Sequence, residues 1–271
     1  MKKVSRRSFF KSLALGSVAG AAGATYARDC SNWLSVERKE LALPNWDASG
    51  FRVALLADLH VNNQAERDRA SGAIQLALQE KPDAVILAGD FVNRSSREVI
   101  ENLQAALTPL LQASCPCIAV MGNHDYWCRK PREVMAAVKS AGVTLLRNQT
   151  LEVQGVSIVG VDDAFQGLQN YEFFPTQKVS KSCLAILHEP DYVEEMPGHV
   201  SLQLSGHTHG GQVCLPFGYA MHTPAGGRRY IAGYYPHANV PLYVTRGVGT
   251  TGIDYRLFCR PEVSILTLRS A

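Results

Sequence analysis

The stretch FRVALLADLH at residues 51–60 decides the fold, because an aliphatic run ends abruptly in the polar residues Asp58 and His60. A run of this kind, rich in Val, Leu and Ala, is typical of a buried strand. Helix-like spacing of apolar residues follows at 65–79, and a second aliphatic run then ends at Asp90. The order is therefore strand, polar end, helix, strand and polar end.

The same alternation continues beyond Asp90. Two further helix patterns and one more strand pattern follow, at 96–113, 131–141 and 117–121. The interval from Asp58 to Asp90 is 32 residues and that from Asp90 to Asn123 is 33. Each interval is about the size of one βαβ unit, so the first half of the chain reads as successive crossovers.

From residue 143 onward, strand patterns dominate the sequence. They lie at 143–146, 156–161, 183–187, 202–204, 242–245 and 263–268. No helix of comparable length is evident there, and no Pro/Ser-rich linker divides the chain. The whole pattern predicts an α/β fold in a single domain, with two packed mixed β-sheets flanked by helices as an αββα sandwich.

The first 27 residues have the features of an export leader. Arg6 and Arg7 precede an apolar run rich in Gly and Ala at 12–24, and residues 25–27 match a signal cleavage site. The run is too short to be a good transmembrane helix. We therefore expect a twin-arginine-type leader at 1–27, a connecting segment at 28–50 and the main domain at 51–271.

This leader predicts a location and a partner. It indicates transfer by the twin-arginine export machinery, with the protein in the periplasm or bound at the cytoplasmic membrane. Whether the leader is cleaved or kept as an anchor stays open. The alternative interpretation is a basic amphipathic lead-in to the first helix.

Composition excludes one class of partner. The formal net charge of +3 is too small to indicate nucleic-acid binding, and part of it lies within the leader. The seven cysteines cannot all pair with one another, and Cys115 and Cys117 lack the spacing of a zinc knuckle. We expect structural cysteines, with their redox state open, and no nucleic-acid partner.

Polar residues of one chemical kind collect where the expected strands end. They are Asp58, His60, Asp90, Asn123, His124, Asp125, His188, His207 and His209. Sites in α/β sheets form outside the carboxyl ends of the strands, so these side chains are expected to share one cleft.

The potential ligands among them suggest two metal ions rather than one. Four histidines, two aspartates and one asparagine are too many for a single ion but suit two ions that share a carboxylate. Mixed imidazole and carboxylate ligands favour Mn, with Fe or Zn as alternatives, over Mg or Ca. Two aspartates leave two divalent ions with a positive surplus, which attracts an anion such as phosphate.

The motifs D-x-H, GD, GNHD, H and GHTH, in this order between Asp58 and His209, resemble the calcineurin-like metallophosphoesterase superfamily. The segments at 206–212, 243–249 and 259–263 look like one bacterial branch of it, several members of which carry a twin-arginine leader. The resemblance implies ligands for a first ion from Asp58, His60 and His209. It implies ligands for a second ion from Asn123, His188 and His207, with Asp90 bridging the two.

The resemblance also implies catalytic roles beside the metals. His124 would contact the phosphate or protonate the leaving group. From its position next to His124, we expect Asp125 to orient that ring by a hydrogen bond, with capping of the next turn as the alternative. Arg94 occupies the arginine position of the phosphatase motif GDxxDRG, but its neighbours Asn93 and Ser95 differ from that motif. We therefore expect Arg94 to be a solvated loop arginine.

The function implied is hydrolysis of a phosphodiester or pyrophosphate bond by a dinuclear metal centre and a metal-bound hydroxide. A lipid-linked or sugar-nucleotide substrate, such as UDP-2,3-diacylglucosamine, resembles the activity of one family branch. Such lipid precursors are made inside the cell, whereas the leader directs the protein outward. The alternatives are a phosphomonoesterase and a non-catalytic binding protein of the cell envelope.

Overall fold

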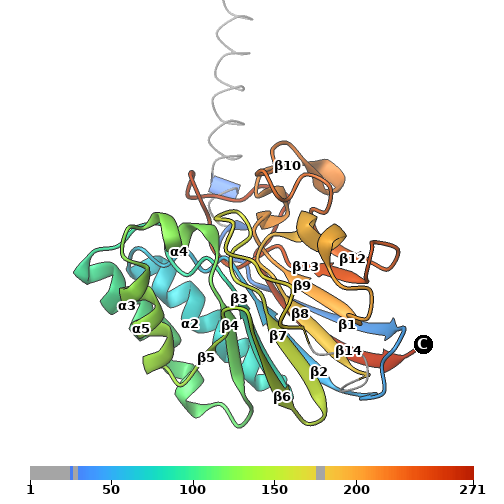
Figure 1. Ribbon diagram of the computed structural model, residues 1–271. Helices are drawn as coiled ribbons and strands as arrows, with labels where there is room; N and C mark the ends of the chain where they lie inside the picture. Colours follow the sequence, from blue (N-terminus) through green and yellow to red (C-terminus); the bar gives the residue numbers. More distant parts are fainter. Residues whose placement is uncertain (1–24, 27–29, 175–180) are drawn as a thin grey trace, which may run out of the picture.

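The structure is a computed structural model that describes residues 25–26, 30–174 and 181–271. The first of its two main sheets contains, in spatial order, β1 (Ser35–Leu43), β14 (Glu262–Ser270), β2 (Arg52–Leu56), β3 (Ala84–Ala88), β4 (Cys117–Val120) and β5 (Thr144–Leu145). The second contains β12 (Gly233–Tyr235), β13 (Leu242–Val244), β9 (Leu202–Ser205), β8 (Cys183–Ile186), β7 (Val156–Gly160) and β6 (Gln149–Val153). A separate hairpin pairs β10 (Cys214–Leu215) with β11 (Tyr219–Ala220). The two main sheets pack face to face as two layers (Figure 1), and one core cluster contains residues of both.

The α-helices follow the strands of the first sheet. They are α2 (Gln64–Gln79), α3 (Arg97–Leu107), α4 (Asn123–Trp127) and α5 (Pro131–Ser140), and the 3₁₀ helices are η1 (Thr108–Gln112), η2 (Pro190–Glu195), η3 (His209–Gly211) and η4 (Pro216–Gly218). The helix expected at 96–113 changes to 3₁₀ geometry after Leu107, since Pro109 has no backbone N–H to continue the α-helical ladder.

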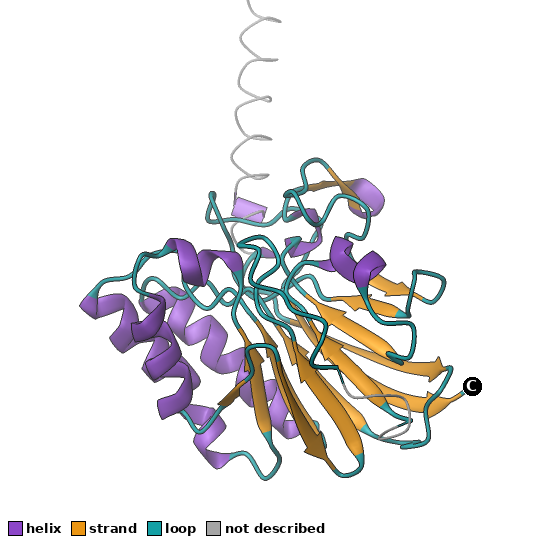
Figure 2. Ribbon diagram, viewed as in Figure 1, coloured by secondary structure: helices purple, strands orange, loops and turns teal. Residues whose placement is uncertain are grey.

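Alternating side chains divide the molecule into layers. In β2, Val53 and Leu55 face the space between the sheets, whereas Ala54 and Leu56 pack toward the helices. A strand buried on both faces reads as a continuous apolar run, which explains the pattern at 51–57. The outer face of the second sheet packs on η2 and irregular segments. Figure 2 shows the α-helices gathered beside the first sheet. The prediction of two mixed sheets flanked by helices is confirmed.

The structure corrects the expectation that residues 28–50 only connect the leader to the domain. Ser35–Leu43 forms β1, which pairs in parallel with β14 along its full length. The strand escaped the sequence pattern because its centre, Glu37 to Glu40, is charged. Charged side chains suit a strand at the edge of a sheet, where they oppose pairing with another chain. The first sheet therefore begins at Ser35.

The predicted leader at 1–27 lies mostly outside the described residues, which include only Thr25 and Tyr26 of it. Within the part of the chain that the structure describes, no helix combines the length and apolar character needed to cross a bilayer.

Candidate metal centre

The strand ends bring the expected ligands together. β2, β3 and β4 run parallel in the first sheet, as do β7, β8 and β9 in the second. Asp58 and Asp90 follow β2 and β3, and Asn123 begins the helix after β4. His188 and His207 follow β8 and β9. All five are buried, so the crevice at these strand ends contains a polar centre inside an apolar frame.

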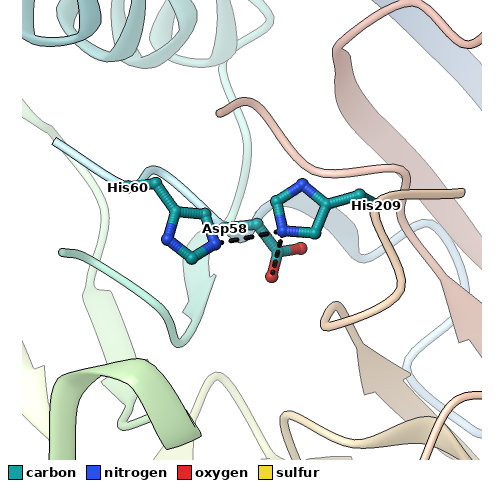
Figure 3. Close-up of side chains that lie close together, drawn as sticks. All are labelled: Asp58, His60 and His209. Atoms are coloured by element: carbon teal, nitrogen blue, oxygen red, sulfur yellow. Dashed lines mark hydrogen bonds and ion pairs between the residues drawn. The ribbon is translucent and has the colours of Figure 1, made fainter. Parts of the chain in front are cut away.

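Asp58, His60 and His209 form a first group in which one ligand atom of each lies within 4.8 Å of the others. The Nε2 atoms of His60 and His209 are 3.0 Å apart, and Nε2 of His209 lies 3.8 Å from Asp58 Oδ1. Figure 3 shows both rings turning a nitrogen toward the same point beside the carboxylate. Three buried donors that converge in this way fit a metal ion.

The protonation states of this group also suit metal binding. Burial lowers the pKa of His60 to about 3 and holds the pKa of His209 well below its usual range. Both rings are therefore neutral at neutral pH, the state in which imidazole binds a metal.

Asp90, His188 and His207 form the second group, again with ligand atoms within 4.8 Å of one another. Asp90 Oδ2 lies 3.2 Å from His188 Nε2 and 3.5 Å from Nε2 of His60, which belongs to the first group. The carboxylate therefore stands between the two groups. This is where a ligand shared by two ions is required.

Asn123 completes the second group. Its Oδ1 is buried and has no hydrogen-bond partner among the described residues. A buried amide oxygen left unpaired is costly unless something else binds it. Asn123 lines the same cavity as Asp90 and His207, so this unpaired oxygen faces the region where a cation fits. The donor set therefore fits two candidate metal-binding sites.

Backbone carbonyls fix the orientation of two histidine rings. Ala88 O lies 2.6 Å from His188 Nδ1, and Ala225 O lies 2.8 Å from His207 Nε2. Because a carbonyl only accepts, each of these ring nitrogens carries the proton. The opposite nitrogen, Nε2 of His188 and Nδ1 of His207, is left as the ligand atom.

The two carboxylates create a place for positive charge. Burial acts to lower the pKa of His188, but Asp90 and Asp58 outweigh it and hold this pKa well above its usual value. Burial also acts to raise the pKa of Asp90, yet His188 and His60 keep it below its usual range. The centre therefore stabilises a cation among these side chains.

Backbone strain collects at the same residues. Asp58, His60, Asp90, His207 and His209 all have φ between 46° and 72°, in the left-handed region. Each non-glycine residue held there costs about 1–3 kcal/mol, and such strain typically clusters at functional sites. The fold therefore forces these side chains into one crevice at the expense of stability.

Gly122, between β4 and α4, is required by the close approach of this loop to Asp90. A Cβ at this position would meet Asp90 Oδ1, and it would lie 2.6 Å from the Asp90 backbone nitrogen. Gly122→Ala is therefore expected to displace the shared carboxylate, and a displacement of about 1 Å can reduce the rate ~100-fold. Metal analysis and phosphodiester turnover would measure both losses. Gly198→Ala is the matched control, since nothing lies within 4 Å of its Cβ. Equal metal content and turnover in the two variants would disprove this role of Gly122.

His124 reaches the centre in two ways. Its backbone N–H donates to Asp90 Oδ1 at 2.9 Å. Its half-buried ring lines the cavity beside the two groups, and its centroid is 5.0 Å from that of His60. The ring forms no hydrogen bond with the described residues, so it is free to meet a substrate.

The structure corrects the expected role of Asp125. Its Oδ2 accepts from the backbone N–H groups of Asp90 and Gly122, and its Oδ1 from those of Phe91 and Val92, at 2.7–3.2 Å. These bonds use the carboxylate on the backbone, so it does not orient the ring of His124. The alternative of a capping role holds, since Gly122 precedes α4. Asp125 therefore positions the loops that carry Asp90 and Asn123.

Arg256 was missed by the sequence analysis. It is fully buried, and its Nη2 donates to the carbonyls of Gly249, Arg246 and Gly247 at 2.6–3.1 Å. Its Nη1 donates to the carbonyl of His209 at 3.2 Å. Arg256 thus ties the β13–β14 connection to a residue of the first group. Its Nη2 also lies 3.4 Å from His209 Nδ1. No motif marks Arg256, because most of its partners are backbone carbonyls.

A cavity of about 390 Å³ adjoins the centre. Its polar lining includes Asp90, Asn123 and His124, and its apolar lining includes Trp127, Phe165, Val213, Met221 and Ile253. A ligand with a phosphate at one end and an apolar group at the other fits such a cavity.

Two candidate metal-binding groups at the strand ends of a two-sheet sandwich are consistent with a dinuclear metalloenzyme. The model for the calcineurin-like phosphoesterase family matches residues 51–211, more than half of the chain, and the chain belongs to this family. It is accordingly a metallophosphoesterase, a hydrolase that acts on a phosphate ester. The resemblance inferred from the five motifs is confirmed.

Relatives match over nearly the whole chain. The phosphodiesterase YaeI of Escherichia coli K12 is 33% identical and aligns over 98% of this chain and 99% of its own. The uncharacterized metallophosphoesterase YkuE of Bacillus subtilis is 31% identical and aligns over 100% of this chain and 99% of its own. Among solved structures, a dimetal phosphatase from Danio rerio superposes with a TM-score of 0.48 and 11% identity, covering 74% of this chain and 88% of its own.

Proposed function

We propose that this enzyme hydrolyses a phosphodiester or pyrophosphate bond with two divalent metal ions, and that its substrate is lipid-linked or a sugar nucleotide. The observation that carries the proposal is the position of the Asp90 carboxylate between the two groups, next to a cavity with apolar walls. The relative YaeI is named a phosphodiesterase, which supports the diester class.

The candidate ligands would bind the two ions as two sets that share one carboxylate. Asp58, His60 and His209 would hold one ion, and Asn123, His188 and His207 the other, with Asp90 shared. Bound ions of this kind polarise a phosphoryl group, neutralise its charge and lower the pKa of water. The mixed imidazole and carboxylate donors favour Mn, with Fe or Zn as alternatives.

His124 would supply the proton. Its ring borders the cavity on the side of Asp90, where the leaving oxygen of a bound ester would lie. Its attachment to Asp90 uses the backbone N–H, so the ring can move a proton without disturbing that carboxylate. Asp125 would keep both loops in register through its four backbone contacts.

We expect a diester to be preferred over a monoester of the same leaving group. A monoester carries more charge and benefits from a fixed cation besides the metals, for which arginine is well shaped. Arg94 borders a neighbouring cavity that also includes His124, but it is exposed and forms no ion pair with the described residues. Turnover of bis-p-nitrophenyl phosphate under saturating Mn²⁺ should therefore exceed that of p-nitrophenyl phosphate.

Arg94→Ala should leave the diester rate within about 2-fold, as expected for an exposed side chain without fixed partners. A monoester preference that disappears in Arg94→Ala would contradict the proposal and make the enzyme a phosphomonoesterase. The same assay, extended to UDP-2,3-diacylglucosamine, tests the lipid-linked substrate class.

We also propose export by the twin-arginine route. The supporting observation is the Arg6-Arg7 pair ahead of a Gly- and Ala-rich apolar run. Arg6→Lys combined with Arg7→Lys keeps the charge, yet should leave the protein in the cytoplasm with its leader uncleaved. Cell fractionation and the mass of the chain measure this. Lys2→Arg with Lys3→Arg is the matched control and should export normally; normal export of both variants would refute the leader assignment.

A further inference from the structure

The β10–β11 hairpin turns an apolar face to solvent. Leu215 pairs with Tyr219 and Cys214 with Ala220, so each pair points to one side of the hairpin. Cys214 is buried, and Ala220 packs against Gly211. Leu215 and Tyr219 therefore lie on the outer side. Figure 1 shows β10 at the top of the molecule, away from both main sheets.

Four alternate positions make up what we call the docking face: Leu215, Phe217, Tyr219 and Met221. They are exposed to 53%, 97%, 70% and 65%, respectively. The solvent side of a hairpin is usually polar, and a contiguous exposed apolar patch marks an interaction site. This face is apolar at every position.

Phe217, at the tip of the hairpin, has a strained backbone conformation as well as an exposed side chain. Its φ is 70°, in the left-handed region where glycine or asparagine is preferred and a bulky side chain is strained. Its ring is almost fully exposed, so folding gains little from burying it. Neither the strain nor the exposure serves the isolated fold, which indicates a partner.

The charge of the surrounding chain indicates which partner. The sequence contains no aspartate or glutamate between Glu195 and Asp254, a stretch that includes the hairpin and the exposed Arg228. Arg260 lines a cavity together with Phe217, and its guanidinium donates to the carbonyls of Trp33 and Leu34 rather than to a carboxylate. Glu37 also lines this cavity, but its carboxylate is paired with Arg246 at 2.8 Å. Arg260 is thus left to complement anionic lipid headgroups.

Aromatic residues extend the apolar surface beyond the hairpin. Phe258 is 47% exposed and lines the same cavity as Phe217. Trp33 is 46% exposed, and its carbonyl accepts a hydrogen bond from Arg260. Tyrosine and tryptophan are enriched where a protein meets the boundary between lipid and water. Phe258, Arg260 and the hairpin tip therefore border one cavity, and Trp33 lies next to Arg260.

We propose that the docking face inserts into the interface of an anionic phospholipid bilayer. Met221 belongs both to this face and to the wall of the cavity beside the metal centre, so docking would bring that cavity to the membrane surface. The inference rests on the surface alone and goes beyond the proposed function. Hydrolysis of a soluble diester does not require it.

The test compares full-length variants on vesicles of phosphatidylcholine and phosphatidylglycerol. Leu215→Ser combined with Phe217→Ser should lower the partition coefficient about 10-fold or more, because two large apolar side chains no longer enter the interface. Leu111→Ser is the matched control: Leu111 is 57% exposed on η1, and its loss should leave partitioning unchanged. Hydrogen exchange at residues 213–221 should slow when vesicles are added to the unaltered chain.

Turnover of bis-p-nitrophenyl phosphate without vesicles should be equal in the double variant and the unaltered chain, which separates docking from catalysis. The proposal would be overturned if the double variant and the unaltered chain partitioned equally onto vesicles. It would also be overturned if vesicles left hydrogen exchange at residues 213–221 of the unaltered chain unchanged. Light scattering tests whether a second copy of the chain occupies the docking face instead. If the unaltered chain self-associates, does not bind vesicles, and loses its self-association in the double variant, the face binds a second copy and the membrane proposal is overturned.

Discussion

Asp90→Ala is expected to empty both metal sites and to reduce phosphodiester turnover by about 10³-fold or more. Asp90 Oδ2 lies 3.2 Å from His188 Nε2 and 3.5 Å from His60 Nε2, so one substitution removes a ligand from each group. Stabilisation of phosphoryl charge by metal ions is worth several kcal/mol, which corresponds to this factor. Inductively coupled plasma mass spectrometry on the purified variant, with steady-state kinetics, measures both effects.

The control for Asp90→Ala is Asp68→Ala. Asp68 is exposed on α2 and, among the residues that the structure describes, pairs only with the neighbouring Arg67 at the surface. Its loss should therefore change neither metal content nor rate. Near-normal metal occupancy and turnover in Asp90→Ala would mean that the two groups do not share this carboxylate, and the dinuclear account would fail.

His124→Ala is expected to keep both metals and to lose about 10²–10⁴-fold in rate, the usual contribution of a general acid. The hydrogen bond to Asp90 comes from the His124 backbone, so it survives the substitution. The loss should be smaller for a p-nitrophenyl leaving group than for an alkyl alcohol, since a good leaving group needs less help from a proton.

Metal content and the dependence on the leaving group separate the roles of His124. His237→Ala serves as the control, because His237 is an exposed histidine outside the cavity and should have no effect. Loss of metal in His124→Ala would make this residue a ligand or a structural support instead of an acid.

The sequence predicts the centre of the fold better than its edge. β2 and β3 are buried on both faces, so their residues form continuous apolar runs that end where Asp58 and Asp90 begin. β1 has exposed charged residues in the middle and therefore gives no such signal. Burial on both faces requires apolar residues and is therefore visible in the sequence. The edge strand β1 is defined mainly by its backbone pairing with β14, which places little restriction on its side chains.

The same distinction applies to the candidate site. The candidate ligands could be named from the sequence because metal binding restricts a position to a few residue types, and the fold brings residues such as His207 and His209 into the two groups. Asp125 and Arg256 could not be assigned correctly, since both act on backbone groups that any sequence provides. Their roles depend on which loops meet in space, and this is visible only in the folded chain.

Anomalous X-ray diffraction from crystals of the Mn-loaded chain tests the central claim most directly. The account predicts two manganese peaks for each chain, one bounded by Asp58, His60 and His209 and the other by His188, His207 and Asn123. Asp90 should contact both. A single peak, or two peaks that do not share Asp90, would contradict it.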